Sequence, residues 1–553
     1  MPSMPSNTLH TMMDYPLTLT ALLERAGRYA TNVEIVSRLP DRSLHRYTWG
    51  QLHQRALRLA ECLHSIGLKK GDRVATLMWN HYAHLECYFG IPAAGGVLHP
   101  LNLRLHPDEI AWIANHAQDR FLIVDDVLLP VLEKFADKVK FERIFVVHHP
   151  PGEPGQSAQH SYADYEDWLQ SASGNFKLPT LSENDGASMC YTSGTTGSPK
   201  GVLYSHRSQV LHSMSQAMAD SCAFSQHDVA LLASPMFHAN GWGFSYTAAM
   251  VGAKYVLPGP HLDAESLLEL IEREGVTMTC AVPTVWLGMV QALEKRPGWK
   301  PARDIRILCG GTAPPESLIR NLDRHGFHLI HSWGMTETSP QATASRLPPA
   351  ALNLPEDEQY AFRSKQGWPV PFVDVRTRHE HGEVPCDGQT MGELEVRGPF
   401  VAGSYYNAPE TADHLTNDRW TADGWFRTGD VATIDPDGCI KLVDRSKDLV
   451  KSGGEWISSV DLENTLMSHP AVREAGVIAV AHPKWQERPL AVVALKEGAQ
   501  ATADDLRIFL SSKFAKWQMP DDFVFVKDLP HTSTGKLLKT ELRKRYADWQ
   551  WQQ

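Results

Sequence analysis

The chain has 553 residues, a length that predicts several structural units and excludes a peptide or a single small domain. Hydrophobic residues make up 42%, charged residues 21% and aromatic residues 9%, which excludes an intrinsically disordered chain and predicts large buried cores. The 53 Lys and Arg residues and 64 Asp and Glu residues give a net charge of −11, a weak acidic bias that gives no indication of nucleic-acid binding.

The cysteines and the apolar stretches predict a reduced, soluble protein of the cytoplasm. No two of the eight cysteines lie closer than 25 positions, which excludes a paired zinc or redox motif, and we interpret them as reduced packing residues. The N-terminal segment lacks the basic and apolar regions of a signal peptide. Residues 229–253 carry no formal charge, but Pro235, His238 and Asn240 interrupt them, so we predict buried core and a cleft wall and no membrane span.

Helix-like and strand-like patterns alternate over most of the chain. The expected elements are a helix over 56–68, a strand over 73–78, a helix over 84–95, strands over 120–125 and 140–148, a helix over 267–274, and strands over 277–281 and 306–309. The polar stretch 347–366 is predicted to be a surface loop. This rhythm predicts an α/β fold with mixed sheets flanked by helices.

The last hundred residues predict a separate α+β unit. We expect a helix over 461–468, a strand over 477–481, a helix over 502–514 and a strand over 523–526. A strand rich in β-branched residues ends in the polar run 443–448, which places the boundary there. We therefore predict an N-terminal domain over 1–443 and a C-terminal domain over 445–553.

The most informative segment is YTSGTTGSPKGV at 191–202. Small hydroxyl residues alternate with glycines and are followed by one lysine, which supplies N–H groups, hydroxyls and a point charge for phosphate oxygens. The residues that supply them are Thr192, Ser193, Gly194, Thr195, Thr196, Gly197 and Lys200. Pro199 before Lys200 excludes the Walker pattern. The alternative interpretation is a flexible surface loop.

With seven further motifs, the sequence resembles the adenylate-forming superfamily of acyl-CoA synthetases, luciferases and nonribosomal adenylation domains. These motifs are PMFHANGW at 235–242, GGTAP at 310–314, HSWGMTE at 331–337, GWFRTGD at 424–430, DRSKD at 444–448, SGGEW at 452–456 and TGK at 534–536. The resemblance covers nearly the whole chain and is strongest to medium- and long-chain fatty-acyl-CoA synthetases. It implies a large AMP-binding N-terminal domain and a small, mobile C-terminal domain.

The resemblance implies a reaction in two halves. A carboxylate attacks the α-phosphate of ATP to give acyl-AMP and pyrophosphate, and the thiol of CoA then displaces AMP. Because two anions meet in the first half, a cation is needed between them. Lys536 matches the family's catalytic lysine, and the alternative is a solvated surface lysine.

Thr336 and Glu337 place a hydroxyl beside a carboxylate, as Mg²⁺ prefers, and the resemblance implies that they orient MgATP. Thr192 and Glu337 are the expected metal ligands, and Asp430 is expected to bind the ribose hydroxyls. A helix start and a turn would also explain these residues. The resemblance further implies nucleotide contacts from Gly311, Thr312, Ala313, His331, Ser332, Trp333, Gly334, Met335, Arg445, Lys447, Lys451, Gly453, Gly454, Glu455 and Trp456.

Asp444 corresponds to the family's hinge, about which the small domain would rotate between half-reactions. One orientation would bring the Lys536 turn to the cleft, and the other would bring Gly453 and Gly454. Trp456 stands where some branches place an arginine, so we expect stacking or gating from it and no phosphate contact.

The substrate is predicted to be an apolar carboxylic acid, most similar to a fatty acid. Amino-acid-activating members carry an aspartate where His238 stands, which argues against an amino acid. His238, Ala239 and Trp242 are expected to contact the acid, with Trp242 as a gate or, alternatively, a packed core residue.

We therefore predict an ATP-dependent acyl-CoA synthetase that uses Mg²⁺ and CoA. A homodimer is a possible oligomeric state. The alternatives are a ligase for a short, thioether or aryl acid such as methylthiopropionate, a luciferase-like oxygenase, and a non-enzymatic nucleotide-binding module. A non-enzymatic binding module would not need two alternative segments at its site, such as the Lys536 turn and the Gly453-Gly454 segment.

Overall fold

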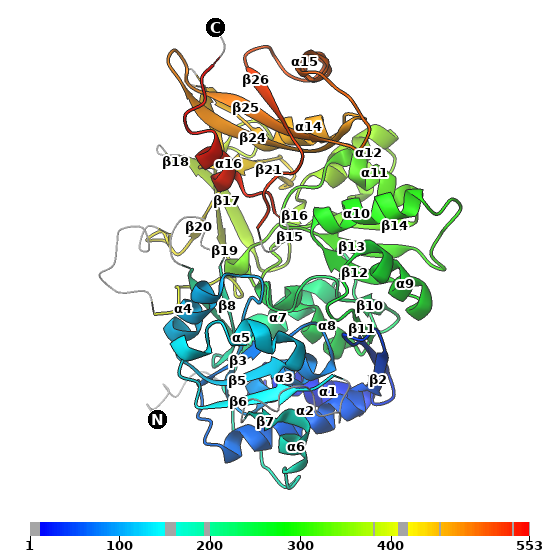
Figure 1. Ribbon diagram of the computed structural model, residues 1–553, viewed down its shortest axis with the longest axis vertical. Coiled ribbons are helices and arrows are strands. Elements are labelled where there is room, and N and C mark those ends of the chain that lie inside the picture. The colour runs from blue at the N-terminus through cyan, green and yellow to red at the C-terminus, as the bar shows by residue number, and fades with distance from the viewer. Residues whose placement is uncertain are drawn as a thin grey trace.

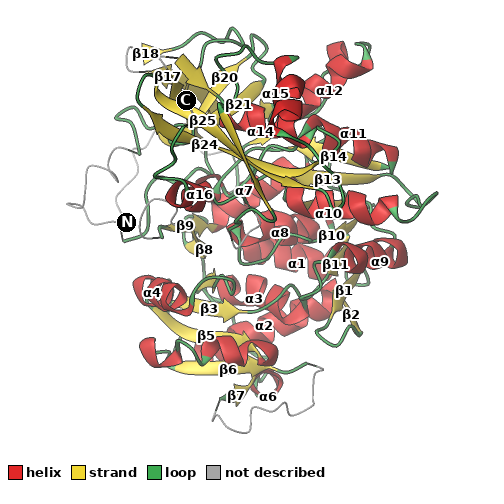
Figure 2. Ribbon diagram, turned by 45° about the horizontal axis from the view of Figure 1, so that its top comes forward, coloured by secondary structure: helices red, strands yellow, loops and turns green. Residues whose placement is uncertain are grey.

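Among the residues that the structure describes, two seven-stranded sheets with flanking helices form the larger part of the molecule (Figure 1). The computed structural model describes residues 12–149, 162–192, 199–379, 382–407, 419–452, 455–532 and 536–551. Figure 2 shows helices packed along both sheets, which buries the apolar faces of their strands.

The first sheet has the strand order β14-β13-β12-β10-β11-β1-β2, and its neighbouring strands are parallel except for β1 and β2. Its strands are β1 (Glu34–Arg38), β2 (Leu44–Thr48), β10 (Val229–Leu231), β11 (Lys254–Leu257), β12 (Met278–Ala281), β13 (Ile305–Cys309) and β14 (Phe327–His331). The glycine motif at 310–314 and the motif at 331–337 therefore begin at the carboxyl ends of two neighbouring parallel strands, β13 and β14.

The second sheet has the order β7-β6-β5-β3-β4-β8-β9 and is parallel except for β8 and β9. Its strands are β3 (Arg73–Leu77), β4 (Val97–Pro100), β5 (Asp119–Asp125), β6 (Arg143–Val147), β7 (Ala163–Asp164), β8 (Gly186–Tyr191) and β9 (Gly201–Ser205). The predicted phosphate loop is thus the connection of the β8–β9 hairpin, at the carboxyl edge of the parallel strands.

Helices cover these sheets (Figure 2). Those of the larger part are α1 (Leu19–Tyr29), α2 (Trp49–Ser65), α3 (Tyr82–Ala93), α4 (Pro107–Ala117), α5 (Leu129–Leu132), α6 (Tyr165–Gln170), α7 (His206–Ala217), α8 (Phe244–Val251), α9 (Ala264–Glu274), α10 (Pro283–Glu294), α11 (Glu316–Arg324) and α12 (Glu356–Ser364). Local sequence sets their starts: at α2, Thr48 and Gln51 form a capping box that satisfies exposed N–H groups.

An antiparallel sheet lies between the parallel sheets and the C-terminal unit (Figure 1). Its strands are β18 (Gly382–Glu383), β17 (Asp374–His379), β19 (Gly392–Arg397), β20 (Phe426–Ile434) and β21 (Ile440–Arg445), and β15 (Thr343–Ala344) pairs with β16 (Trp368–Pro369) nearby. Asp430 and Arg445 face each other across the β20–β21 pair, and Asp444 faces Val431.

The C-terminal unit has its own sheet and core. Its elements are β22 (Val450–Ser452), β23 (Glu455–Ile457), α14 (Ser459–Met467), β24 (Val472–His482), β25 (Gln486–Leu495), α15 (Ala503–Ser511), β26 (Asp522–Val526) and α16 (Lys539–Arg545). The long β24–β25 pair packs against α14 and α15 around Leu462, Val477 and Leu506. Figure 1 shows α16 on the side of this unit that faces the antiparallel sheet.

The predicted α/β architecture is confirmed, and the expected elements are present. Most differ only slightly at their ends, but α2 begins at Trp49, seven residues before the expected start, and β24 spans Val472–His482 where a strand over 477–481 was expected. The uncharged stretch forms β10, the 3₁₀ turn Ala239–Gly243 and α8, and it is largely buried. In the described part of the chain, no helix combines the length and the apolar character that a membrane span needs.

Two expectations were wrong. The stretch 347–366 contains helix α12, whose first turn holds Glu356, Asp357 and Glu358, where carboxylates favour a helix start. The cysteines are unpaired as expected, but Cys386 is exposed and is no packing residue.

Candidate active site

Lys536 of the C-terminal unit reaches into the larger part of the molecule. A β-carbon built on Gly311 would lie 3.1 Å from Lys536 Cε and 3.7 Å from Nζ, and Gly311 has a φ of +90° that favours glycine. The Lys536 turn is held by two hydrogen bonds: Thr532 N donates to Lys536 O at 2.7 Å, and Lys536 N donates to Thr532 Oγ1 at 3.1 Å. The lysine is therefore positioned beside the glycine motif that follows β13.

Charged groups surround the Lys536 ammonium. Burial, reinforced by the charge of Arg445, lowers the pKa of Lys536 to about 8, while the carboxylate of Asp430 acts in the opposite direction. Burial, together with the charges of Lys536 and Arg104, lowers the pKa of His238 to about 3. At neutral pH the site therefore combines a largely protonated lysine with a neutral imidazole.

The carboxylate of Asp430 is oriented from two sides. Trp333 Nε1 donates a hydrogen bond to Asp430 Oδ2 at 2.8 Å, and Arg445 Nε lies 3.5 Å from Oδ1. Trp333 comes from the segment after β14, whereas Asp430 and Arg445 come from β20 and β21. The site therefore joins one parallel sheet to the antiparallel sheet.

Glu337 is a buried carboxylate, only 4% exposed, on the 3₁₀ turn Thr336–Thr338. Tyr405 Oη donates to its Oε1 at 2.6 Å, and Tyr204 Oη donates to the Thr336 carbonyl at 2.6 Å. Burial raises the pKa of Glu337, while the Tyr405 hydrogen bond and the charges of Arg419 and Lys200 oppose this shift.

The neck of the predicted phosphate loop lies beside the same carboxylate. Thr192 N donates to the Lys200 carbonyl at 2.9 Å, and Lys200 N donates to Thr192 Oγ1 at 3.2 Å, which closes the loop at its base. Lys200 Nζ lies 4.9 Å from the centre of the Tyr405 ring, and burial and the charge of Arg419 lower the pKa of Lys200. A hydroxyl, a carboxylate and two cations therefore gather here.

Trp242 lies on a strained segment. Ala239, Asn240, Gly241, Trp242 and Gly243 all have φ between 36° and 75°, in the left-handed region, and each non-glycine there costs about 1–3 kcal/mol. Trp242 is 7% exposed, and its Cη2 atom would lie 3.8 Å from a β-carbon on Gly310. The indole is therefore packed, as one interpretation predicted, and also borders the glycine motif beside Lys536.

The motif at 331–337 is fixed mainly through its backbone neighbours. His331 Nδ1 lies 2.9 Å from the Ser364 carbonyl, and Ser332 Oγ donates to the Thr343 carbonyl at 2.8 Å. A β-carbon on Gly334 would clash with the Pro340 carbonyl, to which Met335 N donates at 3.0 Å. Thr312 and Ala313 lie at least partly exposed next to Gly311.

The structure does not bring all the predicted contacts together. Lys447, Lys451 and Trp456 are exposed on and before the β22–β23 hairpin, with Trp456 42% exposed, while Lys536 lies beside Gly311. The predicted residues outside the described part of the chain are Ser193, Gly194, Thr195, Thr196, Gly197, Gly453 and Gly454, together with the side chain of Glu455.

Three side chains that interact with predicted site residues were missed by sequence reasoning. Tyr405 donates a hydrogen bond to Glu337, and, in addition to burial, the charges of Arg419 and Arg104 lower the pKa values of Lys200 and His238, respectively. Tyr405 lies 68 positions from Glu337, outside the motifs. Their contacts depend on long-range folding, and no local pattern marks them.

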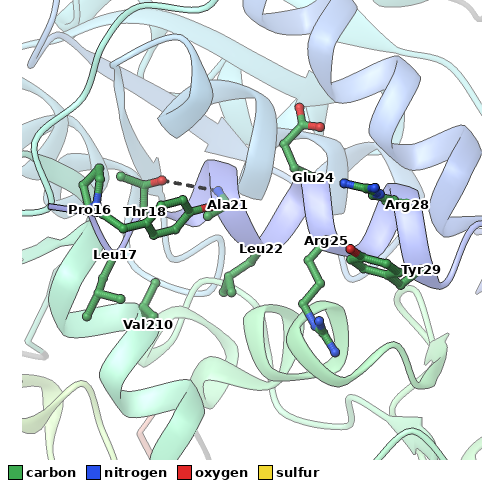
Figure 3. A pocket seen from close by; sticks show the side chains of 11 residues that line it. Pro16, Leu17, Thr18, Ala21, Leu22, Glu24, Arg25, Arg28, Tyr29 and Val210 are labelled. Carbon is green, nitrogen blue, oxygen red and sulfur yellow. Dashed lines mark hydrogen bonds between the residues drawn. The ribbon is translucent and has the colours of Figure 1, made fainter. Parts of the chain in front are cut away.

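A groove of ≈ 430 Å³ lies elsewhere, beside α1 (Figure 3). Its lining includes Tyr15, Arg25, Arg28 and Tyr29 and none of the predicted site residues. The candidate active site is therefore separate from this groove.

Comparison with known proteins identifies the chain's relatives. A long-chain-fatty-acid–CoA ligase of Thermus thermophilus is 46% identical over 541 residues, 98% of this chain and 97% of that protein. A 3-methylmercaptopropionyl-CoA ligase of Ruegeria lacuscaerulensis is 43% identical, with 97% of this chain and 98% of that protein covered. The crystal structure of an anthranilate CoA ligase, AuaEII, in complex with anthranoyl-AMP superimposes with a TM-score of 0.83 at 26% identity, covering 96% of this chain and 98% of that one.

The family descriptions agree with these relatives. The "AMP-binding enzyme" family matches residues 22–406, and the "AMP-binding enzyme C-terminal domain" family matches residues 461–536. With both matches and relatives of this identity along almost its whole length, the chain belongs to the AMP-binding enzyme family.

Proposed function

We propose that the protein is an ATP-dependent acyl-CoA synthetase. It activates an apolar carboxylic acid, a fatty acid, as acyl-AMP and transfers the acyl group to CoA. The observation that carries this proposal is the position of Lys536, which comes from the C-terminal unit and lies beside Gly311, among Asp430, Arg445 and His238. A cation at this point can stand between a carboxylate and the α-phosphate that it attacks.

The surrounding side chains divide the work of the first half-reaction. Asp430, oriented by Trp333, offers carboxylate oxygens to ribose hydroxyls. Lys200 and Arg419 place positive charge where the departing pyrophosphate must be held. The neutral imidazole of His238 can contact the substrate carboxylate without adding charge.

The residues near the phosphate loop fit Mg²⁺. Glu337 is buried, its Oε1 accepts from Tyr405, and the Thr192 hydroxyl lies at the base of the predicted phosphate loop, so both residues offer the hard oxygen ligands that Mg²⁺ prefers. Glu337 and Thr192 would hold the ion, which would neutralise phosphate charge. The protein's own residues orient those oxygens.

The second half-reaction requires a different face of the C-terminal unit. In the present orientation Lys536 lies beside Gly311, and Lys451 and Trp456 are exposed on β22 and β23. We propose that rotation about Asp444 exchanges these faces and admits CoA. The exposed indole of Trp456 would then stack or gate at the cleft.

A medium- or long-chain fatty acid is the favoured substrate, and the similarity to the long-chain-fatty-acid–CoA ligase of Thermus thermophilus supports the long-chain part of this range. A thioether acid is the second candidate, because the Ruegeria lacuscaerulensis relative is nearly as similar. The packed Trp242, on its strained segment beside Gly310, is the side chain we propose to gate the acyl tunnel.

The test is pyrophosphate release with a panel of straight-chain acids of two to sixteen carbons, aryl acids and thioether acids, with and without CoA. We expect release with apolar acids and CoA-dependent turnover. A preference for methylthiopropionate would select the second candidate. Product formation that needs O₂ would indicate the oxygenase, and no release with any acid would contradict the proposal.

We also propose a cytoplasmic location, supported by eight unpaired cysteines, of which Cys386 is exposed. The homodimer stays a prediction. Sedimentation velocity tests it, since a single species of 61.7 kDa would contradict it.

A further inference from the structure

We propose that His81, Asp125 and His149 form a divalent-cation site, separate from the candidate active site. Their ligand atoms all lie within 4.8 Å of one another. His81 Nε2 lies 2.8 Å and His149 Nε2 lies 3.3 Å from the same oxygen, Asp125 Oδ1. Three donors from separate parts of the sequence therefore converge on one point.

The fold places these residues at one edge of a sheet. His81 follows β3 at the start of α3, Asp125 ends β5, and His149 follows β6. Since β6, β5 and β3 are neighbouring parallel strands, their carboxyl ends meet. The phosphate loop follows β8, three strand positions from β5, or about 14 Å at 4.8 Å per strand. The two sites therefore share an edge without sharing residues.

All three side chains are removed from solvent, with exposed fractions of 1%, 0% and 1%. The second oxygen of the carboxylate, Asp125 Oδ2, accepts a hydrogen bond from Trp79 N at 2.8 Å. Asp125 is therefore fixed with Oδ1 directed at both imidazoles. A bound cation would take the place of the protons that these three atoms share.

The hydrogen bonding of this cluster differs from that of an isolated His–Asp pair. Among the described residues, the buried Nδ1 atoms of His81 and His149 have no hydrogen-bond partner. A contrasting pair in the same sheet is self-sufficient: His99 Nδ1 lies 2.9 Å from both oxygens of Asp119. Asp125 instead engages two histidines through one oxygen, an arrangement that a single ion pair does not require.

The donor set indicates the kind of ion. Two imidazole nitrogens and one carboxylate oxygen suit Zn²⁺ and similar transition metals, whereas Mg²⁺ and Ca²⁺ favour oxygen ligands. Zn²⁺ binds such atoms at about 2.0–2.2 Å, which puts any two of its ligands at most about 4.4 Å apart. Because the three ligand atoms are spread over as much as 4.8 Å, binding requires the two imidazoles to move toward each other. Because the site is buried, the ion would fasten the segments after β3, β5 and β6 to one another.

The probe is Co²⁺, whose visible absorption reports imidazole coordination. Untagged protein is stripped with a chelator and titrated without ATP, and Zn²⁺ is then added in competition. We expect one equivalent of Co²⁺ per chain, displaced by Zn²⁺. The variants His81→Gln and His149→Gln should lose this binding. Absence of binding to the parent protein would overturn the proposal.

His148→Gln is the matched control, because its neighbouring buried ring faces Asp126 and Asp164 at 3.5 Å and 3.6 Å. It should bind one equivalent. Circular dichroism and acyl-CoA formation show whether each variant is folded. If His81→Gln does not fold, His149→Gln is the test variant. Binding that survives in a folded His149→Gln protein would overturn the assignment.

A second readout tests what the ion does. Zn²⁺ should raise the thermal midpoint of the parent and of His148→Gln, because a ligand that binds the folded state stabilises it, and should leave His149→Gln unchanged. Stoichiometric binding with no rise in the midpoint would contradict the fastening role.

Discussion

At the scale of single residues, the candidate site works through charges whose strength depends on burial. Lys536 is held at the junction of two structural units with its pKa lowered to about 8, so its proton is weakly held before substrates arrive. Glu337 has a raised pKa, because burial outweighs the nearby cations. Both groups are destabilised in the charged form that anionic phosphate and a metal ion would favour.

Lys536→Ala should abolish adenylation far more than thioester formation. Loss of one preorganised charge at the reacting centre costs about 2.7–4 kcal/mol, or about 10²–10³ in rate. Single-turnover measurements of acyl-AMP and of acyl-CoA check this, and supplying synthetic acyl-AMP with CoA should bypass the defect. Lys513→Ala, on the surface of the same unit, is the control. Equal loss of both half-reactions in a folded protein would contradict the role.

The alkaline limb of the adenylation pH profile should report Lys536. Its pKa is lowered, so the charged form predominates below about pH 8 and is lost as pH rises through that value. The ratio kcat/KM for pyrophosphate release should therefore fall above pH 8, since this ratio reports the unliganded enzyme. Lys536→Arg should be slower but lack this limb, because guanidinium stays protonated. An identical limb in the variant would exclude Lys536 as its source.

Glu337→Gln should raise the Mg²⁺ concentration needed for half-maximal pyrophosphate release and lower the rate. The amide keeps an oxygen to accept from Tyr405 but removes one negative charge from a site for a hard cation. Tyr405→Phe is the matched variant, since it keeps the charge and should shift the titration less. If the Mg²⁺ titration of Glu337→Gln matched the parent's, the carboxylate would be structural.

At the scale of elements, local sequence patterns predicted most helices and strands but few of the contacts between residues far apart in the chain. Apolar periodicity predicted strand β5, which ends at Asp125, and helix α9. Helix α12 was missed because its sequence is mostly polar. Lys536, Glu337 and Asp430 were predicted as site residues from motifs. Tyr405 was not, because its contact to Glu337 spans 68 positions and exists only in the folded chain.

Helix α16 shows how an element can position a residue that it does not contain. It begins three residues after Lys536, and its Lys539 Nζ lies 2.5 Å from Ser459 Oγ and 2.7 Å from Glu463 Oε1, both on α14. Ser459 Oγ in turn donates to Asp444. The Lys536 turn is thereby tied through α14 to the end of β21.

Lys539→Met should loosen this connection. Removing one partner of a buried ion pair costs at most about 3–5 kcal/mol. Burial already raises the pKa of Glu463 to about 7, so without Lys539 the carboxyl binds a proton and recovers part of this cost. Hydrogen exchange at the amides of α14 and β24 should accelerate, and adenylation should slow. Adding Glu463→Gln, which can still accept from Val477 N, should restore protection but not the anchoring of α16. Full recovery of adenylation in the double variant would show that α16 needs no anchor.

At the scale of the whole molecule, one orientation of the C-terminal unit explains which predicted residues meet. Lys536 lies at Gly311, while Lys451 and Trp456 are exposed on the β22–β23 hairpin. All three belong to one unit, so a rotation that brings the hairpin to the candidate active site must move Lys536 away from it. The two halves of the proposed reaction therefore exclude each other in time, and we propose that the segment around Asp444 controls the exchange.

Asp444→Pro should freeze this exchange. Proline fixes φ near −65°, whereas a hinge residue must change its backbone dihedrals between orientations. We expect adenylation to persist, because the present orientation already places Lys536 beside Gly311, and thioester formation to collapse.

Proline also removes a buried carboxylate that accepts from Arg445 N at 2.7 Å and Ser459 N at 2.8 Å. Asp444→Ala removes the same contacts but leaves φ variable, so it should keep the ratio of the two half-reactions near the parent's. Acyl-AMP and acyl-CoA are measured in the same single-turnover sample. If the proline variant makes acyl-CoA at the parent rate, then rotation about Asp444 is not required, and the exchange of Lys536 for the hairpin loses its basis.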